Sequence, residues 1–218
     1  MRREGLAEEI DRTLMELIRP QVTKETLFIV DESDIEKPYA RKMEGCQLVH
    51  NGSKGENTNG YLLLNIMAML PQEDGYKLLP ASSILYSSGM EIDSRKQVLQ
   101  DKIIDQQVTF CGKGTYVFDR GYDDRKLIGF LVDNGVSFVI RGMGTRAVKE
   151  GISEVSFKEI VHNMEFRYEF PGTRKHEGFF CATRRIVVRT EDHYRKHANS
   201  VEVSLVVVRR YQNGTRKG

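Results

Sequence analysis

The sequence predicts an α/β protein, with a mixed sheet flanked by helices and a β-rich region after it. Three observations lead to this prediction. A strand–helix–strand pattern spans residues 115–141, which is typical of a crossover between parallel strands. Two short apolar runs, at 27–30 and 115–118, each end in an aspartate. Beyond residue 152, several stretches alternate β-branched and polar residues, as strands do.

The elements of the first half follow from hydrophobic spacing. Residues 5–19 are predicted to form a helix closed by Pro20, because apolar residues recur at spacings of three and four. Residues 27–30 form a buried strand that delivers Asp31 at its end. Strands at 44–51 and 61–70 form an antiparallel hairpin with a long, mobile tip rich in turn formers. Residues 76–86 are extended, and residues 93–107 form a second helix.

The clearest unit lies between residues 115 and 141. A strand at 115–118 ends at Asp119, and Asp123 is the expected N-cap of a helix that runs through Leu131. Gly135 is the expected C-terminal stop of that helix. The next strand covers 137–141, parallel to the first. Further strands are expected at 165–170, 179–189 and 201–211.

Composition places the chain among soluble globular proteins. It has 218 residues, of which 39% are hydrophobic and 29% charged. It has no run of 18 apolar residues, and no apolar segment follows the basic start. The three cysteines, Cys46, Cys111 and Cys181, are far apart and odd in number, so reduced thiols in the cytoplasm are expected.

Charge is unevenly distributed along the chain. Residues 141–218 hold 16 Lys and Arg against 9 Asp and Glu, a net of +7, whereas residues 1–140 hold 17 against 22, a net of −5. An acidic half joined to a basic half fits a metal-binding core beside an anion-binding surface. Arginine-rich strands that merely face solvent would give the same balance.

The two aspartates that end strands are the candidate chemistry. Ligands bind at the carboxyl ends of parallel strands. Asp31 and Asp119 could share hard cations such as Mg²⁺, which prefer oxygen ligands. Paired metal ions activate the attacking oxygen and stabilise the leaving oxygen in phosphoryl transfer. The alternative is that each aspartate only caps the turn that follows it.

Longer blocks around these acids resemble bacterial insertion-sequence DDE transposases. The family's first-aspartate block is resembled by residues 31–45 (DESDIEKPYARKMEG). Its next block is resembled by Asn51-Gly52-Ser53 together with Gly60-Tyr61. Its second-aspartate block is resembled by residues 118–123 (FDRGYD). Order and spacing agree over about residues 27–141. The β-rich stretch resembles the insertion that some members carry before a final glutamate.

The resemblance implies a ribonuclease-H-like fold with Asp31 and Asp119 as catalytic acids that hold Mg²⁺ or Mn²⁺. A metal-activated water would nick DNA at the element end, and the freed 3′-hydroxyl would attack target DNA. The resemblance also implies action as a dimer. Asp34 is the rival for the first acid, but Asp31 is preferred because it closes the apolar run.

Basic residues near the acids are candidate DNA contacts: Arg120, Lys37, Arg41 and Lys42. Lysine and arginine contacts to phosphate supply most non-specific DNA affinity. A solvated basic loop is an equal alternative.

The chain departs from the family at both ends. The expected domains are an N-terminal helix at 1–22, a catalytic core at 23–150 and a β-rich insertion at 151–218. The family's glutamate-bearing helix is expected after the insertion, where this chain ends in a strand and turn. Glu150, Glu154 and Glu159 show no mark of a substitute ligand. The chain is therefore expected to transfer strands poorly.

Two other hypotheses remain open: a non-catalytic remnant or regulator that binds DNA, and an unrelated metal-dependent nuclease. A second possible metal set, His176, Cys181, His193 and His197, has irregular spacing, so surface histidines are the preferred interpretation.

Overall fold

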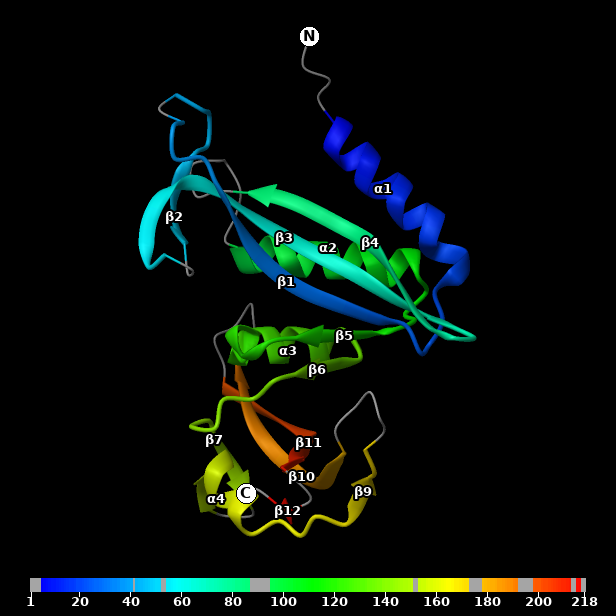
Figure 1. The fold of residues 1–218 in the computed structure, drawn as a ribbon, viewed down its shortest axis with the longest axis vertical. Coiled ribbons are helices and arrows are strands. Elements are labelled where there is room, and N and C mark those ends of the chain that lie inside the picture. The colour runs from blue at the N-terminus through cyan, green and yellow to red at the C-terminus, as the bar shows by residue number, and fades with distance from the viewer. Residues whose placement is uncertain are drawn as a thin grey trace. The chain divides into compact units, whose positions relative to one another are not determined.

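The computed structural model describes residues 5–40, 42–51, 54–86, 95–150, 153–172, 178–191, 198–212 and 215–216. The chain divides into two compact units, residues 1–141 (unit 1) and 142–218 (unit 2). Each unit contains its own six-stranded sheet, and the described residues include four α-helices. The α/β class predicted from the sequence is confirmed (Figure 1).

Unit 1 is built on a mixed sheet. Its strands run in the order β2-β3-β1-β5-β6, with β4 paired to β3. The pairs β1–β5 and β5–β6 are parallel, and the pairs β1–β3, β2–β3 and β3–β4 are antiparallel. The elements are α1 (Leu6–Ile18), η1 (Arg19–Gln21), β1 (Leu27–Glu36), β2 (Gln47–Asn51), β3 (Glu56–Gln72), β4 (Gly75–Tyr86), α2 (Arg95–Thr109), β5 (Thr115–Phe118), η2 (Arg120–Tyr122), α3 (Arg125–Asp133) and β6 (Phe138–Ile140).

One face of this sheet carries the core of unit 1. Residues of α1, α2 and α3 belong to the same buried cluster as alternate residues of the strands, among them Phe28, Val30, Leu64 and Ile66. In Figure 1, α2 runs behind the strands. The intervening strand residues point to the opposite face, where Ile29 and Val117 are only half-buried. We call this second side the open face of the sheet.

A row of five aromatic rings fixes the parallel strands against the helices. Successive ring centroids from Phe110 through Phe28, Tyr116 and Phe118 to Tyr122 lie 5.1, 5.0, 6.3 and 5.4 Å apart. The Tyr116 hydroxyl donates to Gln106 Oε1 of α2 (3.0 Å). Large buried rings contribute strongly to core stability. The row therefore holds β1 and β5 in register up to the point where β5 ends.

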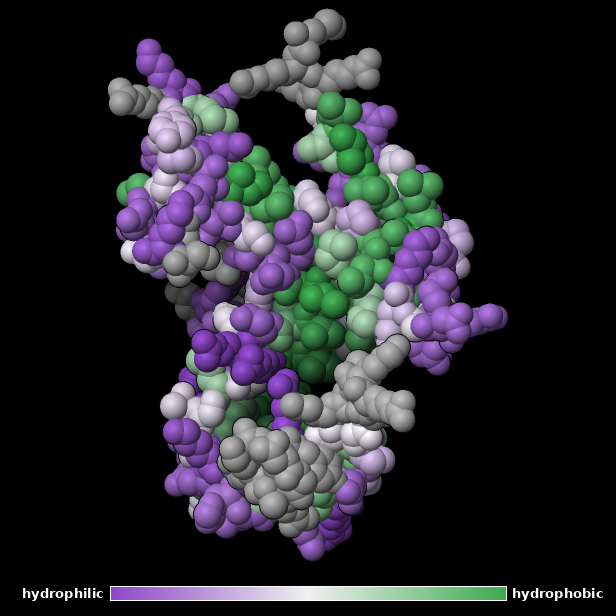
Figure 2. Space-filling view, viewed as in Figure 1, coloured by the Kyte–Doolittle hydropathy of each residue, from purple (hydrophilic) through white to green (hydrophobic). Residues whose placement is uncertain are grey.

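Helix α1 exists where the apolar spacing predicted it, but it buries a different side. The apolar residues Leu6, Ile10 and Leu17 are 44%, 53% and 66% exposed, and Figure 2 shows apolar side chains along the outside of this helix. The buried line instead contains Asp11. Its Oδ2 accepts from Lys102 Nζ of α2 (2.6 Å) and its Oδ1 from the Ser82 hydroxyl of β4 (2.5 Å). The inward side of α1 thus combines this polar contact with the buried side chains of Met15 and Ile18.

The hairpin at 44–70 is tighter than the sequence predicts. The ladder between β2 and β3 continues to Asn51↔Glu56, so the predicted long tip at 51–60 is wrong. Gly60 is needed at the junction of three strands, because a Cβ there would overlap the Ile35 carbonyl oxygen and the Val49 side chain. The turn formers in this stretch serve close strand packing as well as the turn.

The predicted crossover at 115–141 is confirmed as β5-α3-β6 with parallel strands. The N-cap prediction was off by one residue: Asp124, not Asp123, caps α3, and its Oδ1 accepts from the amides of Lys126 and Leu127 (3.1 Å each). Asp123 is buried instead. Gly135 ends the helix in the left-handed region (φ 63°), with Val136 N bonded to Leu131 O.

Unit 2 is rich in strands, as predicted for the second part of the chain. Its sheet has the order β12-β11-β10-β7-β8, with β9 paired to β10. The core gathers Val148, Ile160, Ala182, Ile186 and Val188 on one face of the sheet. The elements are β7 (Ala147–Glu150), β8 (Ser153–Ser156), α4 (Phe157–His162), β9 (Tyr168–Phe170), β10 (Phe179–Glu191), β11 (Ala198–Gln212) and β12 (Thr215–Arg216).

Within the part of the chain that the structure describes, no helix combines the length and the apolar character that crossing a bilayer requires.

Candidate metal centre

Asp31 lies inside strand β1 and does not end it. The predicted strand at 27–30 is confirmed, but it continues through the polar stretch to Glu36, because β3 offers an antiparallel partner along its whole length as far as Gly60. The parallel pairing with β5 does stop at Val30↔Phe118. Asp31 is thus the first residue of β1 beyond its parallel neighbour, and it is exposed.

Asp119 follows the last residue of β5 and caps the short helix η2. Its Oδ1 accepts from the Gly121 amide (2.7 Å), which is the capping role considered from the sequence. Gly121 lies close to this carboxylate, since a Cβ there would come within 3.0 Å of Oδ1. Tyr122 anchors the turn in the core beside Phe118. The Asp-Arg-Gly-Tyr motif therefore holds Asp119 in one exposed position at the end of the strand.

The structure brings Asp31 and Asp119 together on the open face. Val30 and Phe118 are register partners, so each aspartate is the next residue on its strand. Side chains alternate between the two faces along a strand, and the two aspartates come two residues after Ile29 and Val117. Asp31 and Asp119 therefore point to the open face, as Ile29 and Val117 do. Neighbouring strands lie about 5 Å apart. Two carboxylates at this spacing are hard oxygen donors of the kind that Mg²⁺ and Mn²⁺ accept, so the donor set fits such an ion.

Asp34, the rival first acid, lies on the other side of β1. It is three residues beyond Asp31, so it has the opposite parity and pairs across the ladder with Leu62. Of the two acids, only Asp31 shares a face with Asp119.

A polar row beside Asp31 was missed by the sequence argument. Asn65 of β3 is the register partner of Asp31, and Ser83 of β4 is the partner of Asn65. The Ser83 hydroxyl donates to Asn65 Oδ1 (2.9 Å). The one available signal was a single asparagine interrupting the apolar run 61–70. The row extends the oxygen- and nitrogen-bearing part of the open face from Asp119 across to β4.

The candidate DNA-binding residues fall in two places. Arg120 is exposed and directly follows Asp119. Lys37 and Lys42 are exposed beyond the far end of β1, where Lys37 N donates to Asn59 O (2.6 Å). Lys37 is six residues from Asp31, roughly 20 Å along an extended strand. Arg41 lies outside the described residues.

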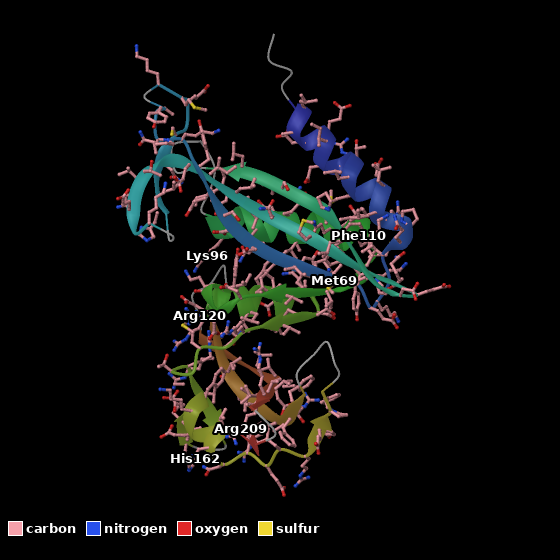
Figure 3. The ribbon with its side chains drawn as sticks, viewed as in Figure 1. Met69, Lys96, Phe110, Arg120, His162 and Arg209 are labelled. Atoms are coloured by element: carbon pink, nitrogen blue, oxygen red, sulfur yellow. The ribbon has the colours of Figure 1, made fainter. Side chains whose placement is uncertain are left out.

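Lys96 is a further cation near Arg120. Figure 3 shows Lys96 and Arg120 at the same end of unit 1. Lys96 Nζ pairs with Asp124 Oδ2 at 2.9 Å. Burial raises the pKa of Asp124, but the hydrogen bonds from Lys96 and from the Leu127 and Lys126 amides outweigh burial and leave this pKa below its ordinary value. The start of α3 is therefore fixed to α2 by an ion pair beside the candidate centre.

Among the described residues, no group of three or more His, Cys, Asp and Glu side chains is placed to hold a metal ion. The candidate centre therefore consists of two aspartates. Of the second set considered from the sequence, Cys181 is half-buried in β10, and His176, His193 and His197 lie outside the described residues. Comparison of the sequence with protein-family models and with curated proteins gives no match.

Proposed function

We propose that this chain belongs to the catalytic core of a DDE transposase and contributes two acids, Asp31 and Asp119, to metal-dependent phosphoryl transfer on DNA. The observation that supports the proposal is the register Val30↔Phe118, which makes Asp31 and Asp119 neighbours on one face of two parallel strands. The proposal includes a ribonuclease-H-like fold for unit 1, a cytoplasmic location, DNA ends and target as substrates, and action as a homodimer.

Mg²⁺ or Mn²⁺, when bound, supplies charge stabilisation and an activated oxygen nucleophile for the attack on a phosphodiester. The two aspartates would hold the cation through their carboxylates. The Gly121 amide keeps Asp119 oriented, and Asn65, which accepts from the Ser83 hydroxyl, is the register partner of Asp31. Arg120, next to Asp119 in the chain, is available to a DNA phosphate.

The test is a calorimetric titration of Mn²⁺ into the full chain. Asp31→Asn and Asp119→Asn are each expected to weaken the affinity at least about tenfold, because each removes one anionic ligand. Asp34→Asn is the matched control, since it removes the same charge from the opposite face of the same strand. If affinity is unchanged in both the Asp31 and the Asp119 variants, the metal site is wrong. If Asp34→Asn weakens binding instead, the first acid is Asp34.

The second candidate function is DNA binding without catalysis, and the basic balance of unit 2 favours it. Residues 142–218 hold 15 Lys and Arg against 9 Asp and Glu, a net of +6. This candidate predicts salt-sensitive DNA binding that persists in both aspartate variants. Cleavage of transposon-end DNA that needs Mg²⁺ and disappears in Asp119→Asn would exclude it.

A further inference from the structure

Strands β9, β10 and β11 leave one side of the unit 2 sheet open. Ala182, Ile186 and Val188 of β10 are buried on the core side. The intervening residues of β10, and their register partners on β9 and β11, point the other way. We call the group at one end of this side the aromatic face: Tyr168, Phe170, Phe179, Val206, Val208 and Arg210, of which Phe179 is half-buried and the others are exposed.

The aromatic face presents large apolar side chains to solvent. Tyr168 is 55% exposed and Phe170 48%, and the branched chains of Val206 and Val208 are 55% and 54% exposed. The Phe170 and Phe179 rings stack with centroids 4.7 Å apart and planes inclined by 19°. Contiguous exposed apolar groups of this kind mark interaction sites. Two of these exposed groups, Tyr168 and Phe170, are aromatic rings.

Charge on the same side indicates an anionic partner. Arg210 shares a cross-strand row with Phe170 and Phe179. Arg185 lies on the same side three rows further along, at 3.5 Å from Glu202, with both side chains more than half exposed. Along β9, β10 and β11, the described acid on this side nearest to Arg210 is Glu202, eight residues before it in β11. Among the described residues of β9, β10 and β11, the aromatic end thus carries a cation and no acid.

We infer that the aromatic face binds single-stranded nucleic acid, with unpaired bases stacked on Tyr168 and Phe170 and backbone phosphates on Arg210 and Arg185. Aromatic rings beside cations are the combination that recognises single strands, because every base has a π-face and every linkage a negative charge. A duplex offers the phosphates, but its bases are already stacked on one another. An apolar protein partner would use the rings but would not account for the net charge of +6 in residues 142–218.

The inference is independent of the metal chemistry proposed for unit 1, since the aromatic face lies within unit 2. Single-strand binding is therefore expected in the presence of EDTA and in the Asp31→Asn and Asp119→Asn variants. Loss of the metal site would leave the aromatic face unaffected. An experiment can therefore contradict one proposal without contradicting the other.

The test measures fluorescence anisotropy of a labelled oligothymidylate with the full chain in EDTA. Tyr168→Ala and Phe170→Ala are each expected to weaken binding by about 5- to 150-fold, the range of base–aromatic stacking. Tyr168→Phe and Phe170→Tyr keep a ring and are expected to keep the affinity. Tyr76→Ala, which removes an aromatic residue that is 64% exposed in unit 1, is expected to change nothing.

Arg210→Ala and Arg209→Ala form a matched pair of charge removals. The two residues are adjacent in β11, but Arg209 points to the opposite side, where its Cζ lies 4.1 Å from the Phe166 ring centroid. Arg210→Ala is expected to lower the salt dependence by about 0.7 in the log–log slope, one phosphate contact on a single strand. Arg209→Ala is expected to leave that slope unchanged.

Three results would overturn the inference. The first is unchanged affinity in Tyr168→Ala and Phe170→Ala variants that fold normally by circular dichroism. The second is binding of a duplex as tightly as the single strand. The third is that the parent chain self-associates in sedimentation, whereas the two alanine variants do not self-associate but still bind oligothymidylate. That result would mean that the aromatic face binds a second copy of the chain.

Discussion

Asn65 is the residue whose substitution tests the candidate centre most sharply. It is the register partner of Asp31, and its Oδ1 is held by the Ser83 hydroxyl at 2.9 Å. Asn65→Asp would place a third carboxylate beside the pair with almost no change of shape. We expect Mn²⁺ affinity to rise about tenfold, because one added negative charge near 5 Å from a divalent ion is worth roughly 1–2 kcal/mol even in water. Calorimetric titration measures the change.

Gln72→Glu is the control for that gain. It adds the same charge to the same strand, seven residues from Asn65 and roughly 24 Å away along β3. At that distance salt screens the added charge almost completely. An equal rise in both variants would mean that the affinity follows overall charge and not the row beside Asp31.

At the scale of single residues, the sequence predicted the acids but not what surrounds them. Asp31 and Asp119 stood out because each follows an apolar run. Nothing in the spacing could show that Asn65 lies opposite Asp31, since that depends on the β1–β3 register across more than thirty residues of chain. The parity that separates Asp31 from Asp34 became decisive only once β1 was seen to continue through both.

At the scale of elements, the start of α3 carries a pH-dependent contribution to stability. Asp124 caps this helix and pairs with Lys96, and its pKa is lowered in the folded state. A group with a depressed folded pKa stabilises the protein above its unfolded pKa and loses that effect as pH falls through the folded value. Asp124→Ala should therefore cost about 1 kcal/mol at neutral pH. The cost should shrink below about pH 4.

Urea unfolding of parent and variant across this pH range checks the prediction. Asp133→Ala serves as the control, because this exposed acid lies at the other end of the same helix and caps nothing. A difference between parent and Asp124→Ala that stays constant from neutral pH to below pH 4 would contradict the carboxylate's role.

Helix α1 is held to the sheet by a buried polar contact, and its loss should be costly. Asp11 is 7% exposed, and its carboxylate pairs with Lys102 Nζ at 2.6 Å. Asp11→Ala leaves the Lys102 ammonium in a largely buried position without its closest partner, so we expect a loss of about 3 kcal/mol in the free energy of unfolding. Asp105→Ala removes the second, exposed partner of Lys102 (3.3 Å) and should cost under about 1 kcal/mol.

Replacing both Asp11 and Lys102 with apolar residues tests whether charge or shape holds α1 in place. Asp11→Leu combined with Lys102→Met should be far less damaging than Asp11→Ala, since no unpaired charge remains buried. A double variant as unstable as Asp11→Ala would mean that shape, and not charge, holds α1.

Predictions of elements succeeded where local spacing decided the structure and failed where a distant partner did. The crossover at 115–141 and the helix at 93–107 follow from nearby residues, and both are present. The polar stretch 31–36 and the turn-rich stretch 56–60 looked like loops. Both are strand: residues 31–36 of β1 pair with residues 60–65 of β3, and residues 56–60 of β3 pair with β2. For residues 31–36 the partners lie 24 to 34 residues further along the chain, so no short window contains both sides of the pairing.

At the scale of the whole molecule, the two units differ in net charge, in line with the two proposed kinds of binding. Residues 1–141 hold 18 Lys and Arg against 22 Asp and Glu, a net of −4, whereas residues 142–218 carry +6. The paired aspartates lie in unit 1, and the aromatic face with its arginines lies in unit 2. A cation is attracted to the first unit and a polyanion to the second, so binding of metal and of DNA should be separable by substitution.

We expect one substitution to weaken metal binding alone and another to weaken DNA binding alone. Asp119→Asn should weaken Mn²⁺ binding at least about tenfold, because an anionic ligand is lost, and leave oligothymidylate affinity in EDTA unchanged. Arg210→Ala should do the reverse, with a clear loss of DNA affinity at low salt that fades as salt rises, since released counterions drive phosphate contacts. Calorimetry and anisotropy on the same protein preparations measure both quantities. If Asp119→Asn weakened DNA binding in the absence of divalent metal, the acidic pair would be acting on DNA by a route other than the cation it holds.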